Sequence, residues 1–197
     1  MKIILASASL RRAEILSDAG ISFELLPVEV DETRRSGENA EAMCTRLAEA
    51  KVRAAVARLG AVNEPAIIVA ADTAVEIDGE ILGKPASPEA AREMLRRLSG
   101  KTHRVLTALA LVRLPDGAAR SDVERTEVRF AALEQDEIEE YVATREPMDK
   151  AGGYAIQGRG GRFVERVDGC YFNVVGLPLA RLCRNLKELG WRPRASR

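Results

Sequence analysis

The sequence predicts an α/β protein with a mixed β-sheet flanked by helices. Strand-like and helix-like segments alternate along the 197 residues. Residues 66–71 form a continuous apolar run, which is typical of a strand covered on both faces. At least three neighbouring strand pairs have hairpin-length connections, which disfavours an all-parallel doubly wound sheet. The length suits one domain, 1–197, with room for two lobes and a site in the cleft between them.

The first third of the chain contains two helices and two extended segments. Ser9 is a candidate N-cap, and Gly20 and Gly60 are candidate helix ends. We expect a strand at 2–6, a helix at 11–18, an extended segment at 21–30, a polar loop at 33–38 and a helix at 40–59.

The middle of the chain begins with the buried strand at 66–71, which ends in Asp72. A hairpin at 74–82 follows, and Asp78-Gly79 supplies its two-residue turn. Ser87 and Pro88 form a cap and a first helical position. We expect a helix at 88–98, a strand at 102–114, a turn at 115–117 and a strand at 123–132.

The last third contains a glycine-rich segment, 149–161, which either lets a ligand approach the backbone closely or forms a mobile loop. Its spacing fits neither a dinucleotide fingerprint nor a phosphate loop. Around it we expect a helix at 135–144, a hairpin of 163–167 and 171–175 about Asp168-Gly169, a helix at 179–189 ended by Gly190, and a basic, frayed tail at 191–197.

Composition excludes several classes of function. Thirty basic and thirty acidic residues cancel, so no global field attracts nucleic acid or an anionic membrane. The apolar runs are too short for a signal peptide or a membrane span, which favours the cytoplasm. Three widely spaced cysteines suit reduced thiols. His103 is the one histidine, so a Cys/His zinc site lacks ligands and a Ser-His-Asp triad would depend on that residue.

Arg11 and Arg12 stand in the first turn of the predicted helix at 11–18. That end of a helix carries partial positive charge and free N–H groups, so cations there are unfavourable. Two interpretations are open from this stretch alone. Either both arginines are solvated, or an anion is bound by the N–H groups, by the hydroxyls of Ser7 and Ser9, and by the guanidiniums.

Lys51 and Asp72 occupy unusual positions. Lys51 lies in the apolar stripe of the helix at 40–59, so its ammonium either extends to the surface or belongs to an anion site at the core edge. Asp72 follows a buried strand, and the carboxyl ends of such strands face the usual ligand crevice.

The unusual side chains together favour chemistry on a polyphosphate. Cations and hydroxyls suit phosphate, and two carboxylates suit a base for water or a bound Mg²⁺ or Mn²⁺. The amide of Gln157 matches a base edge. The predicted reaction is attack of water on a polyphosphate, with cations neutralising the charge of the transition state. The set comprises Ser7, Ser9, Arg11, Arg12, Glu32, Lys51, Asp72, Lys84, Lys150 and Gln157.

Eight motifs, in order over nearly the whole chain, resemble the Maf family of nucleoside triphosphate pyrophosphatases. They are Leu5-Ala-Ser-Ala-Ser-Leu-Arg-Arg12, Val30-Asp-Glu32, Arg46-Leu-Ala-Glu-Ala-Lys51, Ala70-Ala-Asp-Thr73, Gly83-Lys-Pro85, Leu98-Ser-Gly100, Asp149-Lys-Ala-Gly-Gly-Tyr-Ala-Ile-Gln-Gly158 and Val175-Gly-Leu-Pro178. The resemblance implies cleavage between the α and β phosphates with a divalent metal, Mg²⁺ or Mn²⁺. It also implies a cytoplasmic homodimer and a fold like that of the inosine triphosphate pyrophosphatases.

The resemblance also assigns roles. Asp72 matches the family's proposed proton acceptor. Sequence leaves open whether Asp72 accepts a proton from the attacking water or helps Glu32 to hold the metal. Arg12, Thr73 and Gln157 match the positions that distinguish its branches, and all three resemble the dTTP/UTP branch rather than the 7-methyl-GTP branch. The family's phosphate- and metal-handling positions are matched by Ser9, Arg11, Glu32, Lys51 and Lys84, and Ser7 is a further candidate for substrate binding.

Two residues depart from the family's pattern. Leu10 replaces a proline that would preset the first helical turn, and Cys170 replaces a frequent serine. Neither change removes a predicted ligand. The leading hypothesis is a dTTP/UTP pyrophosphatase, a hydrolase acting on acid anhydrides. The alternatives are a 7-methyl-GTP pyrophosphatase and a non-catalytic nucleotide-binding regulator of septum formation.

Overall fold

A computed structural model describes residues 1–60 and 64–193 of the chain. It contains a seven-stranded sheet in the order β2-β1-β3-β5-β6-β7, and β4 also pairs with β3. The strands are β1 (Lys2–Leu5), β2 (Glu24–Leu25), β3 (Ala66–Ile77), β4 (Glu80–Leu82), β5 (Thr102–Leu114), β6 (Ala119–Phe130) and β7 (Val164–Asp168).

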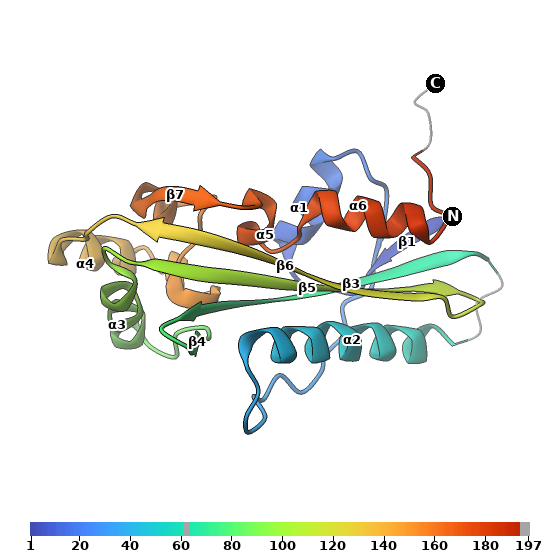
Figure 1. Cartoon of the computed structure of the whole chain (residues 1–197), viewed down its shortest axis with the longest axis horizontal. Helices are drawn as coiled ribbons and strands as arrows, with labels where there is room; N and C mark the ends of the chain where they lie inside the picture. The colour runs from blue at the N-terminus through green and yellow to red at the C-terminus, as the bar shows by residue number, and fades with distance from the viewer. Residues whose placement is uncertain (61–63, 194–197) are drawn as a thin grey trace.

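Helices flank this sheet, as the sequence predicts. The α-helices are α1 (Leu10–Asp18), α2 (Ala40–Leu59), α3 (Pro88–Leu98), α4 (Gln135–Ala143), α5 (Tyr171–Val175) and α6 (Leu179–Glu188). Three short 3₁₀ turns, Glu146–Asp149, Ala151–Gly153 and Arg159–Phe163, give the glycine-rich segment a defined path. Figure 1 shows α2 along one face of the sheet, α1, α5 and α6 along the other, and α3 and α4 at one end.

The sheet is mixed, which confirms the predicted fold class. β1 runs parallel to both β2 and β3, whereas β3, β5, β6 and β7 are successively antiparallel. The parallel pairings are confined to the short strands β1 and β2 and to the first residues of β3, whereas the long strands β3, β5 and β6 form the body of the molecule (Figure 1). Hairpin connections join β3 to β4 and β5 to β6, as predicted.

Alternate residues of β3 contact two different apolar cores. Ile67, Val69 and Ala71 pack with α1 and α6, whereas Ile68 and Ala70 pack with α2. A third core gathers α3 and α4 with aromatic side chains at the other end of the sheet. Because side chains alternate along a strand, neighbouring residues of β3 face opposite layers. This alternation continues through Asp72 and Thr73.

The prediction that the buried strand ends before Asp72 is wrong. β3 continues without a break to Ile77, because β5 pairs with it along the whole stretch from Ala66 to Glu76. On its other side, β1 pairs with residues 66–69 and β4 with residues 75–77. Residues 70–74 therefore form a gap in that edge. Asp72 and Thr73 lie in the gap, beyond the end of β1 rather than of their own strand.

The predicted hairpin of 163–167 and 171–175 is also wrong in its second arm. β7 pairs with β6, but Tyr171–Val175 forms the short helix α5. The chain leaves β7 at Gly169, whose φ is 129°, and the Thr126 hydroxyl binds both the N–H and the carbonyl of Cys170. These contacts stop the ladder and start a helical turn. β6 begins earlier than predicted, at Ala119. Residues 194–197 of the predicted tail lie outside the described residues.

Candidate functional site

Lys51 extends from α2 to the gap in the sheet edge. Its Nζ lies 2.6 Å from Asp72 Oδ1 and 2.8 Å from Glu32 Oε1. The Lys51 and Asp72 side chains are only 11% and 12% exposed. The sequence left open whether the Lys51 ammonium extends to the surface or lies at the core edge. The structure excludes the first interpretation, because the ammonium is paired with two carboxylates at the core edge. A buried cation needs such partners, because desolvation without them is costly.

Glu32 lies in the loop before α2 and is half-exposed. Its hydrogen bond with Lys51 lowers the pKa of its carboxyl. The positive charges of Lys51, Lys84 and Arg12 also lower this pKa, whereas partial desolvation raises it. Lys84, which is exposed after β4, therefore contributes to the same electrostatic field. The structure thus brings Glu32, Lys51 and Asp72 into direct contact although they are widely separated in sequence, and Lys84 acts on Glu32 through its charge.

Cys44 lies behind this cluster on α2 and is fully buried. Burial and the neighbouring Asp72 carboxylate raise the pKa of its thiol, so the sulfur stays protonated near neutral pH. Its Sγ contacts the Leu106 carbonyl at 3.8 Å. Cys44 therefore adds no charge to the site.

The turn between β1 and α1 is built around the buried Ser7. Its Oγ accepts hydrogen bonds from Ser9 N at 3.1 Å and from Arg12 Nη1 at 3.3 Å. These two bonds occupy both lone pairs, so the Ser7 hydroxyl can still donate its proton. Ser9 is at the N-cap position, as predicted, but within the described residues its side chain makes no capping bond. The turn therefore presents hydroxyl donors.

Arg12 points from α1 toward the same gap. Its Nε donates to Gly176 O at 2.8 Å, and its Nη2 donates to Thr73 Oγ1 at 3.1 Å. Burial lowers the pKa of Arg12 and Arg11 acts in the same direction, whereas Asp72 opposes the shift. Two of the three positions assigned to nucleotide choice, Arg12 and Thr73, are thus in direct contact.

Arg11 points instead toward the glycine-rich segment. Its Nη1 lies 3.9 Å from Asp149 Oδ2, and Lys150 Nζ contacts the other oxygen of the same carboxylate. Asp149 therefore lies between two cations on the outer side of the α1 turn. The two neighbouring arginines therefore have different surroundings.

Gln157 is the third position assigned to nucleotide choice, and it is exposed. Its loop is fixed by Glu146, whose carboxylate accepts the N–H groups of Arg159 and Gly160 at 3.1 Å each and the Tyr141 hydroxyl at 2.8 Å. No hydrogen bond within residues 1–60 and 64–193 joins Gln157 to Arg12 or Thr73.

Sequence reasoning missed several polar residues that support the site. Thr107, Thr126 and Asn173 are buried and hydrogen-bonded to one another or to neighbouring backbone, and Thr107 contacts Thr73. A hydroxyl within the apolar run of β5 was the available signal for Thr107. No sequence signal pointed to Glu146, because a single charged residue in a loop is ordinary.

The two carboxylates fit a hard divalent cation. The part of the chain that the structure describes holds no cluster of three or more His, Cys, Asp or Glu side chains suited to a metal. Asp72 and Glu32 do, however, share one cationic neighbour, the Lys51 ammonium, so their oxygens already meet at a position that favours positive charge. Mg²⁺ is commonly held by one or two carboxylates together with substrate phosphates and water. The donor set is consistent with that arrangement.

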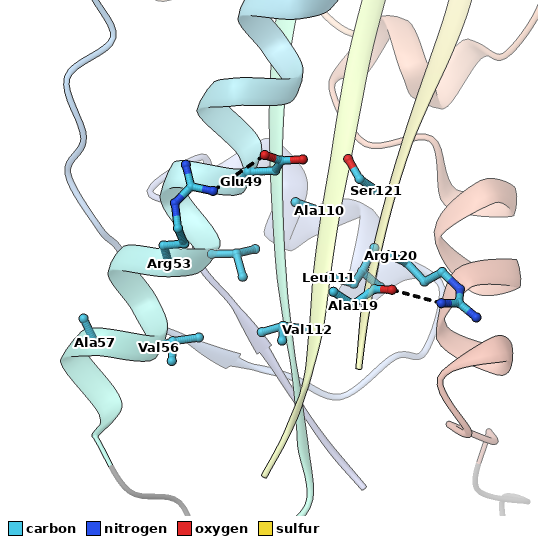
Figure 2. Close-up of a pocket in the computed structure, with 11 residues that line it drawn as sticks. Glu49, Arg53, Val56, Ala57, Ala110, Leu111, Val112, Ala119, Arg120 and Ser121 are labelled. Carbon is cyan, nitrogen blue, oxygen red and sulfur yellow. Dashed lines mark hydrogen bonds and ion pairs between the residues drawn. The ribbon is translucent and has the colours of Figure 1, made fainter. Parts of the chain in front are cut away.

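A separate hollow of about 500 Å³ lies between α2 and strands β5 and β6 (Figure 2). Apolar side chains such as Val52, Val56 and Val112 form its walls, and its lining includes none of the predicted site residues. Figure 2 shows Glu49 paired with Arg53 at its rim, and Arg120 bound to the Ala119 carbonyl. These walls do not suit a polyphosphate, so the candidate site is the polar gap.

Fold and site together define a mixed-sheet protein whose sheet edge presents cations, hydroxyls and two carboxylates around one opening. The description "Maf-like protein" belongs to a family model that matches residues 2–189. The chain belongs to the Maf family. The resemblance in the eight sequence motifs is thereby confirmed.

Known relatives cover nearly the whole chain. A dTTP/UTP pyrophosphatase of Carboxydothermus hydrogenoformans is 46% identical, over 97% of this chain and 100% of its own length. A dTTP/UTP pyrophosphatase of Syntrophus aciditrophicus is 44% identical, over 96% of this chain and 90% of its own. Another from Bacillus cereus is 45% identical, over 95% of both chains.

The solved structures are more distant. The Ham1 protein of Staphylococcus aureus matches with a TM-score of 0.45 and 18% identity, over 66% of this chain and 72% of its own. A nucleoside-triphosphatase (dITP/XTP pyrophosphatase) of Mycobacterium abscessus matches with a TM-score of 0.38 and 17% identity, over 98% of this chain and 100% of its own. The fold assignment therefore rests on the sheet topology and the family match.

Proposed function

We propose that this protein is a nucleoside triphosphate pyrophosphatase that hydrolyses dTTP and UTP to the monophosphate and pyrophosphate. The observation that carries the proposal is the pairing of Lys51 with both Asp72 and Glu32 at the open sheet edge. Beside it, Arg12 contacts Thr73, and both match the dTTP/UTP branch. The relatives named dTTP/UTP pyrophosphatase support the same activity.

In the proposed reaction, a water oxygen bonds to the α-phosphorus while Asp72 accepts a water proton. The bridging bond between that phosphorus and the β-phosphate oxygen breaks, and pyrophosphate leaves with the bond's electron pair. Lys51, Lys84 and Arg11 neutralise the charge that gathers on the phosphate oxygens. Asp72 and Glu32 would hold a divalent cation, Mg²⁺ or Mn²⁺, which supplies further positive charge to those oxygens.

The site also supports catalysis over simple binding. A binding protein needs cations but has no use for a buried carboxylate beside them, since Asp72 would repel a bound phosphate. Lys51 offsets that repulsion and keeps Asp72 in place as a base. The regulator of septum formation therefore ranks below the enzyme. The identities of Arg12, Thr73 and Gln157 and the relatives named dTTP/UTP pyrophosphatase favour the pyrimidine branch over 7-methyl-GTP.

The reaction class is tested by hydrolysis of UTP in ¹⁸O-labelled water with Mg²⁺ or Mn²⁺. The proposal predicts pyrophosphate as product and one ¹⁸O atom in UMP, because water attacks the α-phosphorus. Inorganic phosphate and UDP would indicate cleavage at the γ-phosphate instead, and no product with any triphosphate would favour a binding protein.

We also propose that the protein is a cytoplasmic homodimer, as the family resemblance implies. Within the described residues, no helix is long and apolar enough to cross a membrane. Light scattering coupled to size-exclusion chromatography tests the dimer directly. A mass near 43 kDa, twice the 21.5 kDa of one chain, is expected, whereas a monomer mass at micromolar concentration would contradict it.

A further inference from the structure

A chain of buried hydrogen bonds runs from Arg12 into the core. Arg12 Nη2 donates to Thr73 Oγ1 at 3.1 Å, and Thr73 Oγ1 lies 2.9 Å from Thr107 Oγ1. Thr107 Oγ1 in turn donates to the Asn173 carbonyl at 3.1 Å. These contacts join α1, β3, β5 and α5, and Thr107 and Asn173 are fully buried.

The direction of each bond in this chain can be worked out from donor and acceptor counts. A hydroxyl has one proton, and a carbonyl oxygen can only accept. Thr107 is the donor that the described residues provide to the Asn173 carbonyl, and leaving a buried carbonyl unpaired is costly. The Thr107 proton is therefore committed to Asn173. In the Thr73–Thr107 bond, Thr73 must then be the donor.

Asn173 is itself fixed in place. Its Nδ2 donates to the Val105 carbonyl and to Thr126 Oγ1, at 2.9 Å each. Thr126 also binds both the N–H and the carbonyl of Cys170, just before α5. The residue at the end of the chain is thus held by two side-chain hydrogen bonds of its own, and this keeps the Thr107 hydroxyl in one orientation.

It follows that the Thr73 hydroxyl has no proton left for a ligand. One of its lone pairs accepts from Arg12, and the other remains available as an acceptor. Arg12 uses three of its five N–H donors on Gly176, Ser7 and Thr73, so two remain. The gap in the sheet edge therefore presents an acceptor next to donors.

We infer that Thr107 and Asn173 are positioning residues that make Thr73 an acceptor-only contact, and that this contact selects uracil and thymine over cytosine. Uracil and thymine present an N3–H donor between two carbonyl oxygens, which complements the Thr73 acceptor and the Arg12 donors. Cytosine presents a bare N3 acceptor at the same place, so two lone pairs would face each other. The inference rests on the proposed function and concerns how the same site distinguishes pyrimidines.

The test compares kcat/KM for UTP and CTP in the wild type, Thr107→Val and Thr107→Ser. Valine keeps the shape of threonine but removes the acceptor for the Thr73 proton, whereas serine keeps the hydroxyl. We expect a wild-type preference for UTP on the order of 100-fold. The preference should fall about tenfold in Thr107→Val and be kept in Thr107→Ser.

Ser99→Ala is the matched control, because it removes one side-chain hydrogen bond, from Leu133 N at 2.8 Å, at the end of α3. Its UTP-to-CTP ratio should equal that of the wild type even if its Tm falls as far as that of Thr107→Val. A merely structural role for Thr107 would lower Tm and leave the ratio unchanged.

A second arm needs no variant and holds even if Thr107→Val fails to fold. N3-methyl-UTP retains both carbonyls of UTP but lacks the N3–H, so the wild type should turn it over as poorly as CTP. Equal use of UTP and CTP by the wild type would overturn the inference, as would an unchanged ratio in folded Thr107→Val. Absence of turnover with every triphosphate would instead overturn the proposed function itself.

Discussion

Replacing Lys51 by methionine should destabilise the protein strongly, although methionine packs well at an apolar helix position. The Asp72 side chain is only 12% exposed, and the substitution removes the Lys51 ammonium that lies 2.6 Å from its carboxylate. Removing one partner of a buried ion pair costs about 3–5 kcal/mol. Arg12 still acts on Asp72 electrostatically, so the lower end, about 3 kcal/mol, is appropriate. For a chain of this length, that lowers Tm by about 6–12 °C.

The assay is thermal unfolding followed by circular dichroism at pH 7.5, with two further variants. Lys101→Met is the matched control, because Lys101 pairs with Asp78 at 3.0 Å but both side chains are more than half exposed. It should shift Tm by no more than about 2 °C. The double variant Lys51→Met/Asp72→Asn should recover about 2 kcal/mol relative to additive effects, because the unpaired charge is gone. A Lys51→Met protein as stable as Lys101→Met would refute the argument.

Three further predictions follow from the same structure. Asp72→Asn should reduce pyrophosphate release at least about 100-fold with an unchanged circular dichroism spectrum; near-normal turnover would remove Asp72 from the mechanism. Burial lowers the pKa of His103 from 6.5 to about 4. The contribution of the neutral imidazole to stability is therefore complete above pH 6.5, and about 3 kcal/mol of the free energy of unfolding is lost as the pH falls toward 4. Urea unfolding should show this loss in the wild type but not in His103→Gln, and equal pH slopes would contradict it. Gly152→Ala should lower the free energy of unfolding by about 2–3 kcal/mol, and Gly117→Ala by about 1 kcal/mol. Both glycines have φ near 73°, but only at Gly152 would the added Cβ lie 3.0 Å from the Val75 methyls. Equal urea midpoints for the two alanine variants would be inconsistent with that crowding.

Local sequence patterns were sufficient to predict most of the fold. The Asp78-Gly79 turn, the Ser87 cap and the apolar stripe of α2 are determined within a few residues of chain, and each is found as expected. The prediction of a second hairpin arm at 171–175 was wrong because the alternation of side-chain polarity there resembles that of a strand. Contacts from Thr126 to Cys170 decide that conformation, and they come from a distant part of the chain.

The candidate site was predicted by residue type but not by geometry. Asp72 was singled out as a residue that follows a strand, whereas its position depends on where β1 and β4 stop pairing with β3. Pairing of that kind joins residues far apart in sequence, so no local pattern contains it. Thr107 and Asn173 were missed for the same reason, because their importance comes from a three-dimensional chain of hydrogen bonds.

The alternation of side chains along β3 separates the two proposed functions of the site, which are catalysis and nucleotide selection. Asp72 faces α2 and the charged pair with Lys51, whereas Thr73 faces α1 and the donors of Arg12. The proposed catalytic and selecting groups are therefore adjacent in sequence but belong to opposite layers, and both lie in the gap at residues 70–74. Substitutions on one face should accordingly alter kcat more than selectivity, and those on the other the reverse.

We propose that the gap in the sheet edge hydrolyses pyrimidine nucleoside triphosphates to the monophosphate and pyrophosphate. Its most direct test is pyrophosphate release from dTTP, UTP, CTP, GTP and 7-methyl-GTP, measured with Mg²⁺ and with Mn²⁺, for the wild type and Asp72→Asn in parallel. The wild type should have the highest kcat/KM with dTTP and UTP, and Asp72→Asn should lose pyrophosphate release. Preferential cleavage of 7-methyl-GTP, or release that survives in Asp72→Asn, would contradict it.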